Sequence, residues 1–146
     1  MKKTIRLMTS LLLMTLFVSL FTGCGAALAD AAKLTQYEIG GDKIPSITSV
    51  VGEREVSGVE SSTKNGVSSK QYTYTSDAVY DDLLAYVTRL MDDGWLVTQD
   101  IDLNVVPGSG ELGKKSAEEG QILLVAFSYD QDGYVVNVTK GKGTIE

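Results

Sequence analysis

The clearest pattern of apolar and polar positions runs from Asp77 to Asp93 and predicts an amphipathic helix. Ser76 or Asp77 is expected to cap its start. Gly94 suits the left-handed position after the last turn, from which Trp95 would pack on Leu90. At 100° per residue the apolar side chains fall within an arc of about 160°, and polar side chains lie opposite. The arc holds Val79, Tyr80, Leu83, Leu84, Tyr86, Val87, Leu90 and Met91, and the opposite side holds Asp81, Asp82, Ala85, Thr88 and Arg89.

The residues before this helix predict two β-strands. Scattered β-branched residues over 47–59 indicate a first strand, in which Gly52 and Gly58 suggest bulges. Asn65-Gly66 is typical of a tight hairpin turn, because both residues tolerate a positive φ. The alternation of tyrosine and threonine over 71–75 predicts the second strand.

Three further strands are predicted after the helix. Residues 96–105 alternate, with Val97, Ile101, Leu103 and Val105 on one face and Thr98, Asp100, Asp102 and Asn104 on the other. Residues 107–120 contain four glycines and are interpreted as a long loop. Residues 121–129 and 134–140 would pair across an Asp132-Gly133 turn, which places Leu123, Val125, Phe127 and Tyr129 on the same face as Tyr134, Val136 and Val138. The prediction is an α+β fold of order ββαβββ, with a single amphipathic helix packed on a mainly antiparallel sheet.

The first 24 residues have the organisation of a bacterial export signal. Lys2, Lys3 and Arg6 precede an eleven-residue apolar run over 11–21, which is too short to span a bilayer. The sequence Phe21-Thr22-Gly23-Cys24 follows and resembles the lipobox of bacterial lipoproteins. The resemblance implies cleavage after Gly23 and attachment of a diacylglycerol to Cys24, the only cysteine of the chain. Two alternatives stay open: ordinary secretion after cleavage at Ala27-Leu28-Ala29, and a retained membrane anchor.

These features predict the following organisation. Residues 1–23 are the signal peptide, 24–44 the lipidated cysteine and a flexible tether, 45–142 the α+β domain, and 143–146 a tail. The expected location is the outer face of the cell membrane, as in a Gram-positive bacterium, where two acyl chains give stable anchoring. Beyond the signal, the sequence resembles no functionally characterised family.

Charge and composition narrow the chemistry. Removal of residues 1–23 leaves 10 basic and 19 acidic side chains, a formal net charge of −9. Such acidity argues against binding to nucleic acids and against a polybasic membrane patch. The chain has no histidine, which removes the commonest general base and the commonest metal ligand. No cofactor is predicted.

Two acidic segments imitate calcium loops without completing them. Asp100, Asp102 and Asn104 have the spacing of an EF-hand, with Glu111 at the twelfth position, but Val105 stands where glycine is required. The segment Asp130-Gln131-Asp132-Gly133 could form the middle of such a loop, but Thr139 stands where the bidentate glutamate is required. We therefore interpret the first segment as a strand and the second as a hairpin turn, and predict no metal site. Ser61 and Lys64 have an S-x-x-K spacing but lack the helix start and the further motifs of that nucleophile.

The predicted binding surface is the face of the sheet that one helix leaves uncovered. Tyr72 and Tyr74, with Asp100 and Asp102, are its candidate residues, the tyrosines as anchors and the acids as a bias toward a positively charged partner. The alternatives are a merely solvated face, and a core position for the tyrosines. The leading hypothesis is a lipid-anchored envelope protein whose small domain binds a partner protein or a cell-wall component. A carboxylate-based hydrolase and an extracytoplasmic cation binder are the alternative functions.

Overall fold

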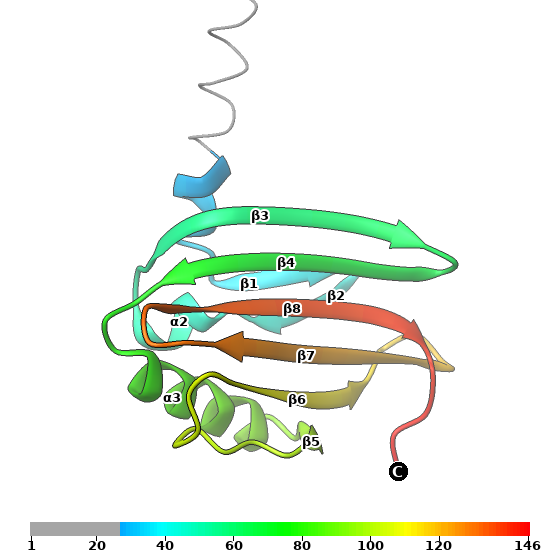
Figure 1. Cartoon of the computed structure of the whole chain (residues 1–146). Helices are drawn as coiled ribbons and strands as arrows, with labels where there is room; N and C mark the ends of the chain where they lie inside the picture. Colours follow the sequence, from blue (N-terminus) through cyan, green and yellow to red (C-terminus); the bar gives the residue numbers. More distant parts are fainter. Residues whose placement is uncertain (1–26) are drawn as a thin grey trace, which may run out of the picture.

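Antiparallel strands make up almost half of residues 27–146, the part of the chain that the computed structural model describes (Figure 1). Six of them form one sheet in the order β3-β4-β8-β7-β6-β5, and two more form a separate hairpin. The strands of the sheet are β3 (Glu55–Lys64), β4 (Val67–Thr75), β8 (Gly133–Lys142), β7 (Gln121–Tyr129), β6 (Gly108–Lys115) and β5 (Leu96–Gln99). The hairpin consists of β1 (Gln36–Ile39) and β2 (Asp42–Pro45).

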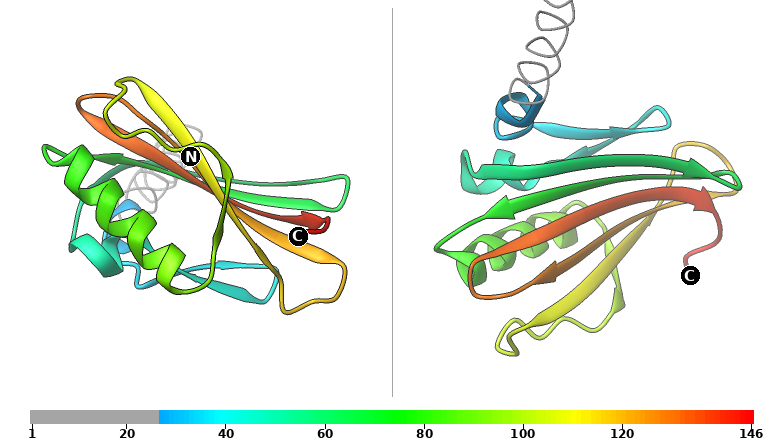
Figure 2. Two further views of the ribbon diagram at one scale, coloured as in Figure 1. Left: turned by 90° about the horizontal axis from the view of Figure 1, so that it is seen from below. Right: turned by 45° about the horizontal axis from the view of Figure 1, so that its top comes forward.

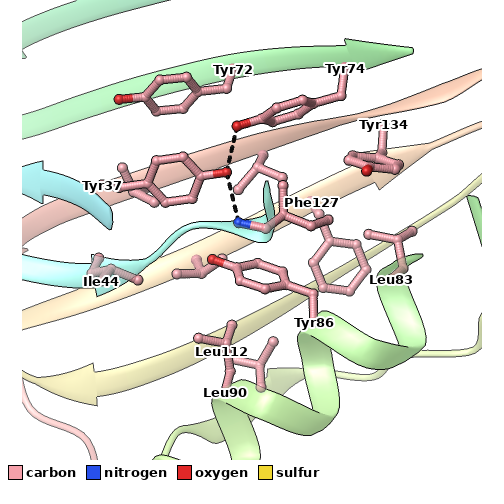
Figure 3. Packing of buried hydrophobic residues seen from close by; sticks show 14 of the residues in the cluster. Tyr37, Ile44, Tyr72, Tyr74, Leu83, Tyr86, Leu90, Leu112, Phe127 and Tyr134 are labelled. Atoms are coloured by element: carbon pink, nitrogen blue, oxygen red, sulfur yellow. Dashed lines mark hydrogen bonds between the residues drawn. The ribbon is translucent and has the colours of Figure 1, made fainter. Parts of the chain in front are cut away.

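The helices and the hairpin lie on one face of the sheet (Figures 1 and 2). The helices are α2 (Ile47–Val51), α3 (Val79–Asp92) and a short turn over residues 27–31. The long helix α3 packs near the β5 end of the sheet, and the β1–β2 hairpin with α2 covers the half nearer β3 (Figure 2). The core fills the space between these layers, and its fully buried side chains include Tyr37, Ile44, Tyr86, Leu90 and Val125 (Figure 3). The predicted α+β class is confirmed.

The predicted amphipathic helix is confirmed, with a different start. Its C-terminal end has the expected geometry: Gly94 has a φ of 88°, and the Trp95 N–H donates to the Leu90 carbonyl at 3.0 Å. Trp95 is buried. The helix begins after Ala78, whose side chain cannot cap, so the predicted capping by Ser76 or Asp77 is wrong. Ser76 Oγ instead accepts a hydrogen bond from the Ala78 N–H at 3.0 Å.

The region before α3 differs from the predicted pair of strands at its N-terminal end. Residues 47–51 form α2 rather than strand, because the Ser46 side chain accepts from the Ser49 N–H and starts a helix there. Gly52 ends that helix at a φ of 88° and is not a bulge. The bulge at Gly58 is confirmed by the register break between Val56 and Gly58. The hairpin turn is also confirmed, since Asn65 and Gly66 have φ values of 54° and 76°.

After α3 the sheet has four strands where three were predicted. The strand expected over 96–105 ends at Gln99, and residues 100–107 form a loop. The long loop expected over 107–120 contains β6, which pairs with β7 along its whole length. The predicted register of β7 and β8 is confirmed, with Phe127 opposite Val136 and Val125 opposite Val138.

The flexible tether predicted over 24–44 is wrong for residues 36–44. These residues lie in the β1–β2 hairpin, and Tyr37, Ile39 and Ile44 are buried in the core. Each of the two short strands points alternate side chains inward, so a segment without a long period still contributes to the core. The predicted tail also lies against the sheet: Ile145 Cδ1 lies 2.5 Å from the position that a Cβ on Gly113 would take, so a larger residue there would displace the Ile145 side chain.

Candidate functional site

The two tyrosines predicted to bind a partner lie in the core, which corrects the predicted binding face. Tyr72 and Tyr74 are 5% and 2% exposed. The Tyr72 ring stacks on Tyr37 with ring centroids 4.5 Å apart, and the hydroxyls of Tyr74 and Tyr37 are hydrogen-bonded at 2.7 Å (Figure 3). Burial raises the pKa of Tyr74 to about 12. The physical reason is the β1–β2 hairpin, which covers this half of the sheet and was not predicted.

The two candidate acids are exposed, but they lie in a loop and not on a strand. Asp100 and Asp102 belong to residues 100–107, which join β5 to β6. Asp102 Oδ1 accepts the backbone N–H of Asn104 at 3.0 Å, and the Asp102 carbonyl accepts the Tyr129 hydroxyl at 2.7 Å. The structure therefore separates these acids from the predicted tyrosines.

An apolar groove lies between α3 and this loop. It has a volume of about 450 Å³ and is lined by Tyr80, Leu84, Val87, Met91, Val97, Asp100, Ile101, Asp102, Leu103 and Asn104. Tyr80, Leu84, Met91 and Val97 each keep between 45% and 53% of their surface exposed, although they lie beside one another. We call this feature the α3 groove.

The groove continues past the first turn of α3. A second hollow of about 230 Å³ shares Tyr80 and Leu103 with it and reaches Val79, Leu83 and Val106. Val106 is also exposed, as is its neighbour Val105. The two hollows thus form one apolar surface along the exposed side of α3. A contiguous surface of this kind is unusual on a monomeric domain and is typical of a binding site.

Acidic side chains flank the α3 groove on both sides. Asp81 and Asp92 are exposed on α3, each directly beside an apolar groove residue in the sequence, and Asp100 and Asp102 line the loop side. The only basic side chain of α3, Arg89, is paired with Asp93 at 2.9 Å. The groove therefore combines an apolar floor with a negative rim.

Sequence reasoning placed the groove residues of α3 in the core. Tyr80, Leu84 and Met91 were assigned to the predicted apolar arc, yet they stay in solvent. The sequence did indicate that part of the apolar arc would be exposed, because an arc of about 160° is wider than the stripe of roughly 100° that a surface helix buries.

A polar hollow of about 390 Å³ lies where β4 ends and β8 begins. Its lining includes Ser57, Thr73, Thr75, Asp130 and Asp132. Asp130 Oδ1 already accepts the backbone N–H groups of Asp132 and Gly133, at 2.8 and 3.1 Å. This carboxylate therefore shapes the hairpin turn, in agreement with the interpretation of this segment as a turn.

A buried ion pair, which sequence reasoning missed, joins α3 to the sheet. Arg54 donates two hydrogen bonds to the Asp82 carboxylate at 2.7 and 2.8 Å, and Ser76 and Tyr134 donate at 2.7 and 2.9 Å. Burial by itself raises the pKa of the Asp82 carboxyl, but these hydrogen bonds outweigh it and hold the pKa below its usual value. Every acceptor position is used within the protein, so the pair has a structural role.

A second buried cluster joins the β1–β2 hairpin to the sheet. Lys140 Nζ lies 2.8 Å from Asp42 Oδ2 and 3.0 Å from Glu118 Oε2, and it donates to the Gly40 carbonyl at 2.6 Å. Asp42 also accepts from Ser116 Oγ at 2.6 Å and from the Ala117 N–H at 3.0 Å. The two carboxylates raise the pKa of Lys140, which keeps this lysine charged.

Within residues 27–146, no three acidic or other ligating side chains form a group that could hold a metal ion. In the same residues, no helix combines the length and the apolar character needed to cross a membrane. Cys24 and Gly23, the predicted lipid-attachment and cleavage residues, lie outside the described residues.

No family model, curated protein or solved structure matches the chain. The functional argument therefore rests on the sequence and on the geometry of the α3 groove.

Proposed function

We propose that the protein is a lipid-anchored cell-envelope protein whose α+β domain binds an apolar segment of a partner protein in the α3 groove. The observation that carries the proposal is the row of half-exposed apolar side chains of Tyr80, Leu84, Met91 and Val97 in one groove. Leaving this surface in water is unfavourable by about 25 cal/mol per Å², and a partner that covers it recovers that free energy.

The position of the groove fits a tethered binding domain. The described chain begins at residue 27, in a helical turn beside β3, whereas β5 and the α3 groove lie at the opposite edge of the sheet (Figure 1). A lipid on Cys24 would hold the β3 edge toward the membrane and leave the groove accessible to proteins of the envelope.

Binding is favoured over the carboxylate-based hydrolase. Hydrolysis of a glycoside requires two carboxylates that face each other across a cleft, roughly 5–10 Å apart. Among the described acids that line a hollow, Asp102 and Asp130 each accept backbone N–H groups of their own loop. The α3 groove has an apolar floor, which suits recognition.

Site-specific photo-crosslinking in the native cells tests the proposal. A photoreactive residue at Leu84 should yield a discrete adduct with one partner protein, and the same residue at Glu60, exposed on β3, is the matched control. When the photoreactive residue replaces Met91 instead, the additional substitution Leu84→Asp should remove the adduct. If positions 84 and 91 give no adduct beyond that at position 60, the proposed binding function is wrong.

The anchoring part has its own test. Cys24→Ala should leave unprocessed precursor in the membrane or redirect cleavage toward Ala29, and the unsubstituted mature protein should carry a lipid mass on Cys24. A mature protein that begins at Asp30 without a lipid would contradict lipid anchoring, but it would not contradict binding of a partner in the α3 groove.

A further inference from the structure

The geometry points to the chemical class of the partner: we propose that the α3 groove binds a cationic amphipathic helix. This inference rests on the proposed binding function and specifies the occupant of the same groove. Its first support is the charge of the rim. Asp81 and Asp92 on one side and Asp100 and Asp102 on the other leave a negative field over an apolar floor.

A matching ligand places apolar side chains on the floor and lysine or arginine toward both rims. An amphipathic basic helix presents this arrangement, because its apolar stripe is bordered by charge on each side. The exposed stripe of α3 runs from Tyr80 to Met91, twelve residues whose ends lie about 16 Å apart along the helix. A ligand helix of about three turns therefore covers it.

An extended strand is a poorer ligand for this site. The strand that borders the groove, β5, has only four residues, and its pairing with β6 has a register break between Val97 and Gln99. A short, irregular edge offers few backbone groups for pairing with an added strand. The groove is also lined by side chains of α3, and not by a free strand edge alone.

Two other occupants are disfavoured by charge. A second copy of this chain would bring the same acidic rim against itself, and the chain after residue 23 has a formal net charge of −9. An anionic membrane surface would be repelled by the same four aspartates. A cationic partner is attracted by them, and this attraction weakens as salt increases.

Binding of model peptides tests the proposal. The mature protein, held in zwitterionic lipid nanodiscs, is titrated into a labelled leucine–lysine amphipathic peptide of roughly 18 residues, long enough to form a helix. The comparison peptides replace every lysine by glutamate, or shuffle the same residues so that no apolar face remains. Fluorescence anisotropy is the readout, with empty nanodiscs as the blank. We expect the amphipathic leucine–lysine peptide to bind at least about tenfold more tightly than either comparison peptide.

Substitutions in the protein show where the peptide binds, and they separate the apolar from the electrostatic contribution to binding. Leu84→Asp should abolish binding, whereas Val67→Asp, at a similarly exposed apolar position on β4, should not. The double variant Asp100→Asn, Asp102→Asn should weaken peptide binding several-fold and reduce the salt dependence of that binding. The control is the double variant Glu55→Gln, Glu60→Gln on β3, which removes the same amount of charge and should not change binding. Asn at position 102 keeps an oxygen that can accept the Asn104 N–H.

The outcomes distinguish the two proposals. Equal binding of the lysine and glutamate peptides, or unchanged binding in the double aspartate variant, would overturn the cationic partner but leave the groove as a binding site. Leu84-dependent dimerisation, or binding to anionic vesicles in preference to the peptide, would also overturn it. The absence of a crosslinked partner at positions 84 and 91 in cells contradicts the proposed function itself.

Discussion

Asp82 is the residue at which three separate segments of the fold meet. Its carboxylate receives Arg54 from the segment before β3, Ser76 from the segment before α3, and Tyr134 from β8. A buried charge is tolerated only when its hydrogen-bonding capacity is used, and here four donors use it. The exposed neighbour Asp81 has no such role.

Asp82→Asn should therefore destabilise the protein, and Asp81→Asn is its matched control. Removing one partner of a buried ion pair costs about 3–5 kcal/mol, and Arg54 is partly exposed, so we expect roughly 3 kcal/mol. Asp81→Asn should change the free energy of unfolding by less than about 0.5 kcal/mol. Urea unfolding at neutral pH measures both values. Equal effects of the two substitutions would show that the ion pair contributes nothing.

The same carboxylate predicts a loss of stability in acid. The folded-state pKa of Asp82 is below its unfolded value, so its stabilisation is complete above the unfolded pKa. It is lost as the pH falls through the folded-state pKa. Urea unfolding of the unsubstituted protein should show this loss below about pH 4, and Asp82→Asn should lose less over the same range. Parallel pH profiles would contradict the assignment.

Buried tyrosines predict a loss of stability in alkali. Burial raises the pKa of Tyr74 to about 12 and also raises the pKa of Tyr37, so the folded state resists the ionisation of both. Their stabilising effect is complete below the unfolded pKa of about 10 and is lost as the pH rises through the folded-state value. Absorbance of tyrosinate should rise together with unfolding, and Tyr74→Phe should shift this transition to higher pH. Ionisation of Tyr74 without unfolding would contradict its burial.

At the scale of the element, the apolar side chains of α3 fall into a buried group and an exposed group. Leu83, Tyr86 and Leu90 face the sheet and are buried, whereas Tyr80, Leu84 and Met91 lie in the α3 groove. The loop over residues 100–107 forms the other wall, and Ile101 and Leu103 attach it to the core. One helix therefore contributes both to the core and to the proposed binding surface.

Leu90→Ala and Met91→Ala, at adjacent positions, should separate these functions. Leu90→Ala should lower the free energy of unfolding by about 2–5 kcal/mol, because it leaves a cavity in the core. Met91→Ala should cost little stability and should weaken capture of the crosslinked partner. Denaturant melts and the photo-crosslinking assay measure the two effects. The reverse order of stabilities would mean that the orientation of α3 is wrong.

At the scale of the whole molecule, an N-terminal hairpin completes a core that the sheet and α3 leave open. Tyr37 and Ile44 are buried in the core, where Tyr37 lies beside Tyr72 and Tyr74 of the sheet (Figure 3). The contact between Asp42 and Lys140 joins the second strand of the fold to the last strand. The β1–β2 hairpin, which was predicted to be part of a flexible tether, is therefore built into the domain.

Asp42→Ala should loosen the β1–β2 hairpin, because it leaves Lys140 and Ser116 without their carboxylate partner. Backbone amides of residues 36–45 should exchange hydrogen faster, while those of β7 keep their protection. Glu38→Ala, which breaks an exposed pair with Lys43 on the same hairpin, is the matched control and should change little. Uniformly faster exchange across the sheet would contradict a local role for this contact.

The sequence alone determined the features that depend on local chain chemistry. The periodicity of α3, its Gly94 end, the Asn65-Gly66 turn and the pairing of Phe127 with Val136 all follow from neighbouring residues and short-range sterics. The candidate acids Asp100 and Asp102 were also identified as exposed before the structure.

The tertiary structure alone decided which apolar and polar side chains are covered. Strand β6 has three glycines and no sustained alternation, yet pairing with β7 makes it a strand. Tyr72 and Tyr74 are buried because a hairpin from the supposed tether covers them, and Tyr80 and Leu84 are exposed because no segment within residues 27–146 covers them. Burial depends on contacts between residues far apart in the chain, so a local pattern can predict a face but not its partner.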